Sequence, residues 1–239
     1  MKLPATYQIP LIVAAIPLVT FGCLFISIVF GGANSASDGF TLYNTFVSNG
    51  SFGFFETIYL IIAYAAVPAI CEELVFRAIL CREFEKYSPL CAIVASSPFF
   101  ALLHFDVAQF PVYLFAGILL ALSMYATGSV VVPMIIHFFY NVIGLFGQPF
   151  LNAFYKVTGG SSGLFAFIVL MLALLFAALF CKFASKSYER RAEFSNMPKR
   201  PIIPSADTLV RAVSDILLTP WSVAAICFYI VVIVIYSIL

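Results

Sequence analysis

Residues 57–80 read TIYLIIAYAAVPAICEELVFRAIL, an apolar run that carries two carboxylates and a guanidinium in its second half. An ionisable side chain at the centre of a membrane span costs at least ~2.5–3.5 kcal/mol, so such residues are usually paired or functional. On a helix, Glu73 and Arg77 share a face, with the acid N-terminal to the base. Glu72 is rotated by about 100° from Glu73. The spacing predicts that Arg77 holds Glu73 and fixes the helix geometry, while Glu72 stays free to act as a general base.

The composition of the whole chain agrees with a membrane setting. Of its 239 residues, 63% are hydrophobic and 10% are charged, against roughly 45–50% and about 25% in a soluble domain. We therefore expect an all-α, polytopic transmembrane bundle, an integral multi-pass protein in contact with membrane lipids. A net charge of +1 gives no indication of nucleic-acid binding. The six cysteines occur singly and without CxxC, so they are interpreted as small hydrophobic residues.

Apolar runs of the length that crosses a hydrocarbon core, about 20 residues, predict about seven spans in a single membrane domain, residues 1–239. They cover residues 9–30, 54–80, 89–105, 107–126, 129–146, 164–183 and 221–239. The first is interpreted as a retained span, because its apolar run is longer than the about 7–15 residues of a signal peptide. Residues 31–53 and 147–163 are predicted polar loops. Residues 184–219 are predicted to be a basic cytoplasmic loop, solvated and partly disordered.

The basic residues predict the orientation of the bundle. With the N-terminus inside, Lys156 is the one basic residue on the outer side, and the other 11 of the 12 Lys and Arg residues lie inside. The bundle is therefore expected to be N-in and C-out. No internal repeat is visible, although transporters with inverted repeats often show one weakly. A proton-coupled carrier that uses Glu72 and the histidines as a relay is for this reason the least favoured alternative.

Both histidines of the chain lie in apolar runs. Phe100 lies one turn before His104, and His137 lies one turn before Asn141, so each pair shares a helical face. A lone intramembrane His is usually a satisfied hydrogen-bonding group. Two His, an amide, two Glu and an Arg are each costly to bury unpaired. The whole set therefore favours a functional site over a purely structural role. Asp106 is interpreted as a boundary charge at the outer surface.

These side chains suit hydrolysis by an activated water. Glu72 with His104 could orient and deprotonate the water, while His137 and Asn141 donate hydrogen bonds to the oxyanion. Alternatively, Glu72, His104 and His137 could bind zinc, since two His, one Glu and a water form an accepted catalytic set. No HExxH motif is present and these ligands lie on three predicted helices. Metal-free chemistry is therefore favoured, and no cofactor is expected.

The depth of these residues in the predicted spans differs. Measured along the helices from the inner edge, Glu72 and His137 lie ~12 Å deep, whereas His104 lies ~22 Å deep. If the three side chains meet at one site, the third span must tilt or begin in the cytosol.

The chain contains three short patterns in its apolar runs: EExxxR from Glu72, FxxxH from Phe100 and HxxxN from His137. Together they resemble the three motifs of the CPBP family. This family contains membrane-embedded type II CAAX proteases and bacteriocin-processing or immunity proteins, also called Abi proteins. Each motif alone is weak, but all three in this order, each in an apolar span, form a specific signature. The resemblance covers a catalytic core of about residues 54–146.

The resemblance implies a glutamate-type intramembrane endopeptidase in which Glu72 and His104 activate water and His137 and Asn141 form the oxyanion site. Its substrates would be peptides or lipidated proteins, as in CAAX processing or peptide maturation, cut near a cytoplasm-facing cavity. The short chain with brief loops is more similar to the prokaryotic branch, so a prokaryotic cell membrane is expected. The alternative is a non-catalytic bacteriocin-immunity or scaffold protein of the same fold, which binds a toxin or partner.

Overall fold

The computed structural model of the chain describes residues 3–38, 53–194 and 204–238, and these residues form helices and connections without a β-strand. The expected all-helical fold is thereby confirmed. In chain order the elements are η1 (Thr6–Gln8), α1 (Ile9–Asp38), α3 (Phe54–Leu60), η2 (Ile61–Ala66), α4 (Val67–Glu73), η3 (Leu74–Leu80), α5 (Cys81–Phe84), α6 (Pro89–Leu102), α7 (Phe110–Thr127), α8 (Val131–Phe146), α9 (Gln148–Val157), α10 (Ser162–Phe194), α11 (Ala206–Leu218) and α12 (Pro220–Ile238).

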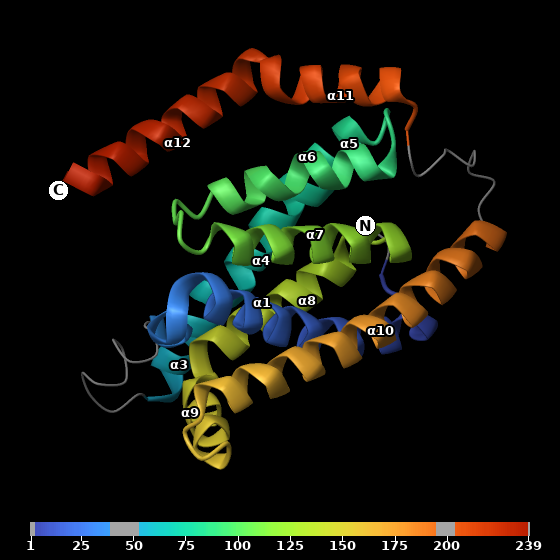
Figure 1. Cartoon of the computed structure of the whole chain (residues 1–239). Helices are drawn as coiled ribbons and strands as arrows, with labels where there is room; N and C mark the ends of the chain where they lie inside the picture. The colour runs from blue at the N-terminus through green and yellow to red at the C-terminus, as the bar shows by residue number, and fades with distance from the viewer. Residues whose placement is uncertain (1–2, 39–52, 195–203, 239) are drawn as a thin grey trace.

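The helices are stacked in layers across the molecule. In Figure 1, α11 and α12 lie at the top, α5 and α6 beneath them, then α7, with α10 and α9 in the lower part. α1 packs mainly against α10 and α7, and α8 packs against α1, α4 and α7. The largest core cluster joins buried apolar residues of α1, α7 and α8 with Phe76, Phe100 and Phe180. The layers thus bring the three motif-bearing segments, Phe54–Phe84, α6 and α8, into one core.

Local signals set the ends of α6 and α7. Ser88 precedes α6 and its Oγ accepts the N–H of Cys91 at 3.0 Å, while Pro89 occupies the first helical position. Both are preferred start signals, because the first turn of a helix lacks internal partners for its N–H groups. Gly128 ends α7 in the left-handed conformation, with φ of +69°. These signals fix where α6 begins and where α7 turns toward α8.

Within the described ranges, four helices are long and apolar enough to cross a membrane: Thr6–Phe30, Phe54–Phe84, Phe110–Thr127 and Ser162–Arg191. A fifth span would result if the bent pair Val131–Phe146 and Gln148–Val157, with 71° between the two helices, is counted as one. Two further apolar helices are shorter, Pro89–Leu102 and Ser222–Ile235. Each of the seven predicted apolar segments is therefore helical. By length and composition four or five of them qualify as spans, so the count of seven and the N-in orientation stay predictions.

Residues 147–163 were expected to be a polar loop, and this expectation is wrong. The segment forms α9 and the start of α10, because Leu151 and Phe154 pack against a buried cluster of α1 and α10. An amphipathic helix gains its stability from such packing, which the count of apolar residues misses. The turn itself is confined to the few residues around Gly159 and Gly160, both with positive φ.

The other two predicted loops are also partly helical. Residues 31–38 continue α1, and the rest of the loop expected at 31–53 lies outside the described residues except for its last residue. In the segment 184–219, α10 continues to Phe194 and α11 forms, while residues 195–203 lie outside the described residues. Ser187 and Arg191 explain the longer α10, since they donate to carbonyls at the end of α7 at 3.0 and 2.8 Å.

Replacing Gly128 by Ala is expected to lower the melting temperature of the detergent-solubilised protein. A left-handed conformation costs a residue with a Cβ roughly 1–2 kcal/mol, and a Cβ here would lie 2.6 Å from Nε of Arg191. Gly163→Ala is the matched control, because a Cβ at Gly163 meets nothing within 4 Å. Equal melting temperatures for both variants would contradict this role of Gly128.

Candidate active site

Glu72 and Glu73 lie at an irregular point of a long helical stretch. The stretch runs from Phe54 to Phe84, and two π-helical segments, η2 and η3, flank the α-helical turns of α4 that end at Glu73. Such π-helical segments are rare and occur frequently at functional sites. The acidic pair therefore lies in a short α-helical stretch between two π-helical segments.

Glu73 and Arg77 form the expected ion pair. Nη1 of Arg77 donates to Oε1 of Glu73 at 3.0 Å, and both side chains are fully buried. Nη2 of Arg77 donates to the carbonyl oxygen of Gly117 on α7 at 2.9 Å. The guanidinium also lies 4.6 Å from the ring centre of Phe100 on α6, within the range of a cation–π contact. Arg77 thus joins its own helix to α6 and α7.

Glu73 has a second partner that the sequence did not indicate. Nδ1 of His137, on α8, lies 2.9 Å from the same oxygen of Glu73 that binds Arg77. A carboxylate can only accept a hydrogen bond, so Nδ1 of His137 carries a proton. The role of Glu73 therefore extends beyond the helix geometry expected from its spacing with Arg77, because it also orients an imidazole 64 residues away.

Glu72 makes no hydrogen bond to the part of the chain that the structure describes. Its Oε2 is buried without a hydrogen-bonding partner among the described residues. Its nearest ionic contact is Nε2 of His137, at 3.9 Å, and its side chain is 20% exposed. No hydrogen bond or ion pair joins Glu72 to His104 in the described structure, so the structure places Glu72 beside the other histidine.

His104 lies just after the last residue of α6 and is fixed on two sides. Nδ1 lies 2.9 Å from the carbonyl oxygen of Phe100, and because a carbonyl oxygen only accepts, Nδ1 carries the proton. Nε2 then keeps its lone pair. The imidazole also stacks on the ring of Tyr113 on α7, with centres 3.8 Å apart and planes 17° apart.

The ring of Phe100 lies between the two histidines. Its centre is 5.1 Å from the centre of His104 and 5.7 Å from that of His137. The two imidazoles therefore share one aromatic neighbour and belong to the same part of the bundle. α6, which precedes His104, has only 14 residues, about 21 Å of helix, so the third segment is shorter than the predicted span.

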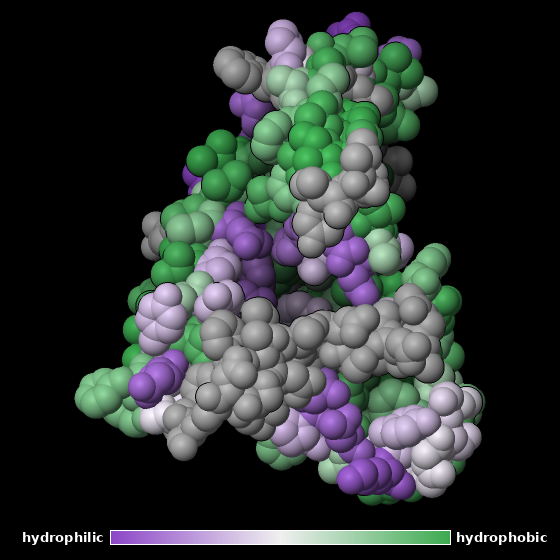
Figure 2. Space-filling model, turned by 90° about the vertical axis from the view of Figure 1, so that its left-hand side faces the viewer, coloured by the Kyte–Doolittle hydropathy of each residue, from purple (hydrophilic) through white to green (hydrophobic). Residues whose placement is uncertain are grey.

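A cavity of about 940 Å³ adjoins these residues. His104 and Asn141 line it, whereas Glu72 and His137 do not. Its apolar walls come from α1, α9 and α10 and include Phe21, Leu24, Leu151, Phe154 and Leu172. Figure 2 shows hydrophilic side chains gathered around a hollow in the middle of one face of the molecule. Of the four proposed catalytic residues, the structure places two on the cavity and two within the adjacent buried cluster.

Sequence reasoning did not identify several polar residues that line the cavity. Tyr113 and Tyr140 lie in apolar runs at positions where an aromatic residue is ordinary, and only the packing of α7 and α8 brings them to the cavity. Asp106 was interpreted as a boundary charge, but it lines the cavity two residues after His104, and its Oδ1 accepts the N–H of Gln109 at 3.0 Å. The sequence feature that could have indicated this role of Asp106 is its place two residues after His104, in the polar connection between two apolar runs.

The three candidate zinc ligands are Glu72, His104 and His137. Within the described part of the chain, no group of three or more His, Cys, Asp or Glu side chains has an arrangement that would hold a metal ion. His104 directs Nδ1 to a backbone carbonyl, and His137 directs Nδ1 to Glu73.

Replacing Arg77 by Met is expected to destabilise the protein strongly. Removing one partner of a buried ion pair typically costs about 3–5 kcal/mol, because the other charge stays buried without compensation. Denaturant unfolding in detergent micelles measures the loss. Lys86→Met is the matched control, since it breaks an exposed pair with Glu83 and should change the stability little. A variant at Arg77 as stable as this control would show that the buried pair does not hold the bundle.

Comparison with known proteins agrees with the motifs. Residues 54–143 match the family model described as type II CAAX prenyl endopeptidase Rce1-like. No curated protein and no solved structure matches the chain. The matched segment contains all three motifs, while α1, α10, α11 and α12 lie outside it. The resemblance inferred from the motifs is confirmed: over residues 54–143 this membrane protein is similar to the Rce1-like type II CAAX prenyl endopeptidases.

Proposed function

We propose that the protein is a membrane-embedded endopeptidase that hydrolyses peptide bonds by a water activated without a metal ion. The observation that carries the proposal is the buried cluster of Glu72, Glu73, Arg77 and His137 beside a cavity lined by His104 and Asn141. The match to the type II CAAX endopeptidases supports the same class of reaction. Peptides or lipidated proteins in a prokaryotic cell membrane are the proposed substrates.

In the proposed reaction, a water bound between Glu72 and His104 attacks the scissile carbonyl carbon. Glu72 is the general base that takes the proton of the water, and its Oε2 has no hydrogen-bonding partner among the described residues. Nε2 of His104 has a lone pair, because Nδ1 is engaged with the Phe100 carbonyl, so it accepts the second hydrogen bond of the water and orients it. The proton then passes to the nitrogen of the leaving amine when the C–N bond breaks.

The oxyanion formed in this step would be bound by Asn141 and by Nε2 of His137. Because Nδ1 of His137 already carries a proton, Nε2 can donate only when the ring is an imidazolium. Glu72 and Glu73 contribute two negative charges and Arg77 one positive charge, so an imidazolium at His137 brings the net charge of the buried cluster to zero. Fixed donors of this kind stabilise the charge that develops in the transition state.

A non-catalytic immunity or scaffold protein is the second candidate. The observation that favours it is the separation of the motif residues: Glu72 does not line the cavity and has no hydrogen bond to His104. A binding protein would use the same cavity for a partner and would not need the carboxylate. Glu72→Gln separates the two candidates, because protection of cells by this variant would favour binding over chemistry.

Glu72→Gln is expected to lower the cleavage rate by roughly 10²–10⁴-fold, the usual contribution of a general base. The measurement uses purified protein in detergent with prenylated, membrane-tethered and unmodified peptides. Glu56→Gln, an exposed change on the same helical stretch, is the control and should keep full activity. Full activity of Glu72→Gln would reject the assignment of the base.

A chelator added to the same assays tests the metal-free mechanism. Activity that survives it supports the mechanism above. Activity that is lost and then restored by zinc would overturn it, in favour of zinc held by Glu72, His104 and His137.

Tyr113→Leu is expected to lower kcat about tenfold or more without a matching change in KM, because reactive groups must be held in a defined geometry. Tyr113→Phe should keep near-normal kcat, since it keeps the stacked ring on His104. The chain contains two histidines, so ¹⁵N-histidine spectra can show whether the Nδ1–H form of His104 is lost in the Leu variant. A loss in Tyr113→Phe equal to that in the Leu variant would assign the effect to the hydroxyl group instead.

A further inference from the structure

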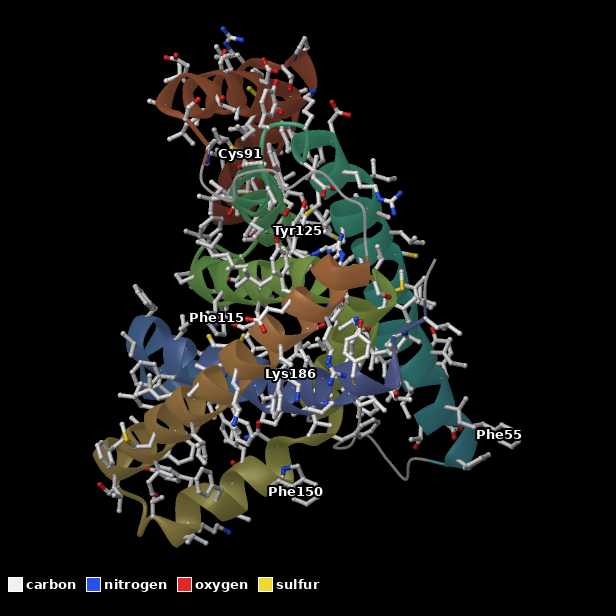
Figure 3. All side chains as sticks on the ribbon, turned by 90° about the vertical axis from the view of Figure 1, so that its right-hand side faces the viewer. Phe55, Cys91, Phe115, Tyr125, Phe150 and Lys186 are labelled. Carbon is white, nitrogen blue, oxygen red and sulfur yellow. The ribbon has the colours of Figure 1, made fainter. Side chains whose placement is uncertain are left out.

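The bundle has two chemically different ends. At one end, three side chains bond to the last carbonyls of α7: Gln8 to Thr127 at 3.0 Å, Ser187 to Ala126 at 3.0 Å, and Arg191 to Tyr125 at 2.8 Å. These bonds bring together the start of α1, the end of α7 and the C-terminal part of α10. Figure 3 looks at this end and labels Tyr125 and Lys186. We call it the basic end.

Basic side chains gather toward this end of the molecule. They lie on α5 and the connection after it, on the C-terminal half of α10 and on α11, and they are Arg82, Lys86, Lys182, Lys186, Arg190, Arg191 and Arg211. α11 is tied to the same end by the hydrogen bond of Tyr87 to Asp215. In membrane proteins the end richest in Lys and Arg faces the cytoplasm, so the basic end is assigned to the cytoplasmic side.

The cavity lies at the other end of the bundle, here called the cavity end. Its walls come from the second half of α1, the α6–α7 connection, the start of α7, the last turns of α8, and α9. Figure 1 places the α6–α7 connection and α9 at the left, and the α5–α6 turn and the end of α10 at the right. Among the described residues of the cavity end, Lys156 on α9 is the one basic side chain, and Asp106 and Glu56 are acidic.

The candidate catalytic groups on the cavity are close to this end. Asn141 lies five residues before Phe146, the last residue of α8, or about 7.5 Å of helix. His104 lies beyond the last residue of α6, in the connection itself. A substrate therefore has a short path to these groups from the cavity end and a path through most of the bundle from the basic end.

We propose that the candidate active site takes its substrate from the non-cytoplasmic side of the membrane, as a peptide segment exposed at that surface. This inference rests on the proposed function and on the predicted N-in orientation, and it differs from the expectation of a cytoplasm-facing cavity. The proposed substrates are therefore peptide segments that reach the outer surface, either while they are still attached to the membrane or after they have been released from it. The acidic Asp106 at the cavity and the scarcity of basic residues around it are the charge pattern expected on that side.

Cysteine labelling in intact cells tests the sidedness directly. The background replaces the exposed cysteines Cys71, Cys181 and Cys227 by Ala, and single cysteines are then introduced as Ser161→Cys at the cavity end or Glu83→Cys at the basic end. A membrane-impermeant maleimide should label the first in intact cells and the second only after permeabilisation. The reverse pattern would overturn the inference.

Cleavage by oriented vesicles gives the second arm of the test. The probe is a sulfonated, internally quenched peptide that the detergent-solubilised protein cleaves, and Glu72→Gln vesicles are the control for other proteases. Right-side-out vesicles should cleave it without detergent, and inside-out vesicles only after detergent is added. Cleavage restricted to inside-out vesicles would overturn the inference. If no peptide is cleaved even in detergent, the proposed function fails, and the labelling alone decides which way the cavity faces.

Discussion

The carboxylate of Glu73 is the buried charge on which the arrangement of the bundle depends. One of its oxygens accepts hydrogen bonds from Arg77 at 3.0 Å and from His137 at 2.9 Å. Arg77 in turn binds the Gly117 carbonyl and lies over Phe100. An ion in a low-dielectric interior costs several kcal/mol unless it is well paired. The segment that carries Glu73 is therefore held to α6, α7 and α8, since moving any partner leaves a charge uncompensated.

This arrangement gives the two histidines different hydrogen-bonding partners. His137 donates from Nδ1 to the carboxylate of Glu73, whereas His104 donates from Nδ1 to the carbonyl oxygen of Phe100. In each ring Nε2 is thereby the nitrogen left to meet a ligand. The close approach of α6 and α7 supports this geometry: a Cβ on Gly117 would lie 3.2 Å from Cα of Ser97.

The cavity is lined partly by the segment that matches the family model and partly by helices outside that segment. His104 and Asn141 belong to the segment that matches the family model, residues 54–143. Much of the apolar wall belongs to α1, α9 and α10, which lie outside that segment. The chemistry is thus proposed for the matched core. The shape of the space next to it depends in part on helices that the match does not cover.

The sequence by itself determined the helical membrane class and the Glu73–Arg77 pair, because composition and a four-residue spacing act locally and need no partner segment. It did not determine α9, the long end of α10 or α11, since these polar and amphipathic helices are stabilised by contacts with distant parts of the chain. Only the tertiary structure decided that Glu73 also binds His137, and that Tyr113 stacks on His104. The physical reason is that helical periodicity fixes which face a side chain occupies, whereas its partner, and hence the position of its proton, depends on which helix packs against that face.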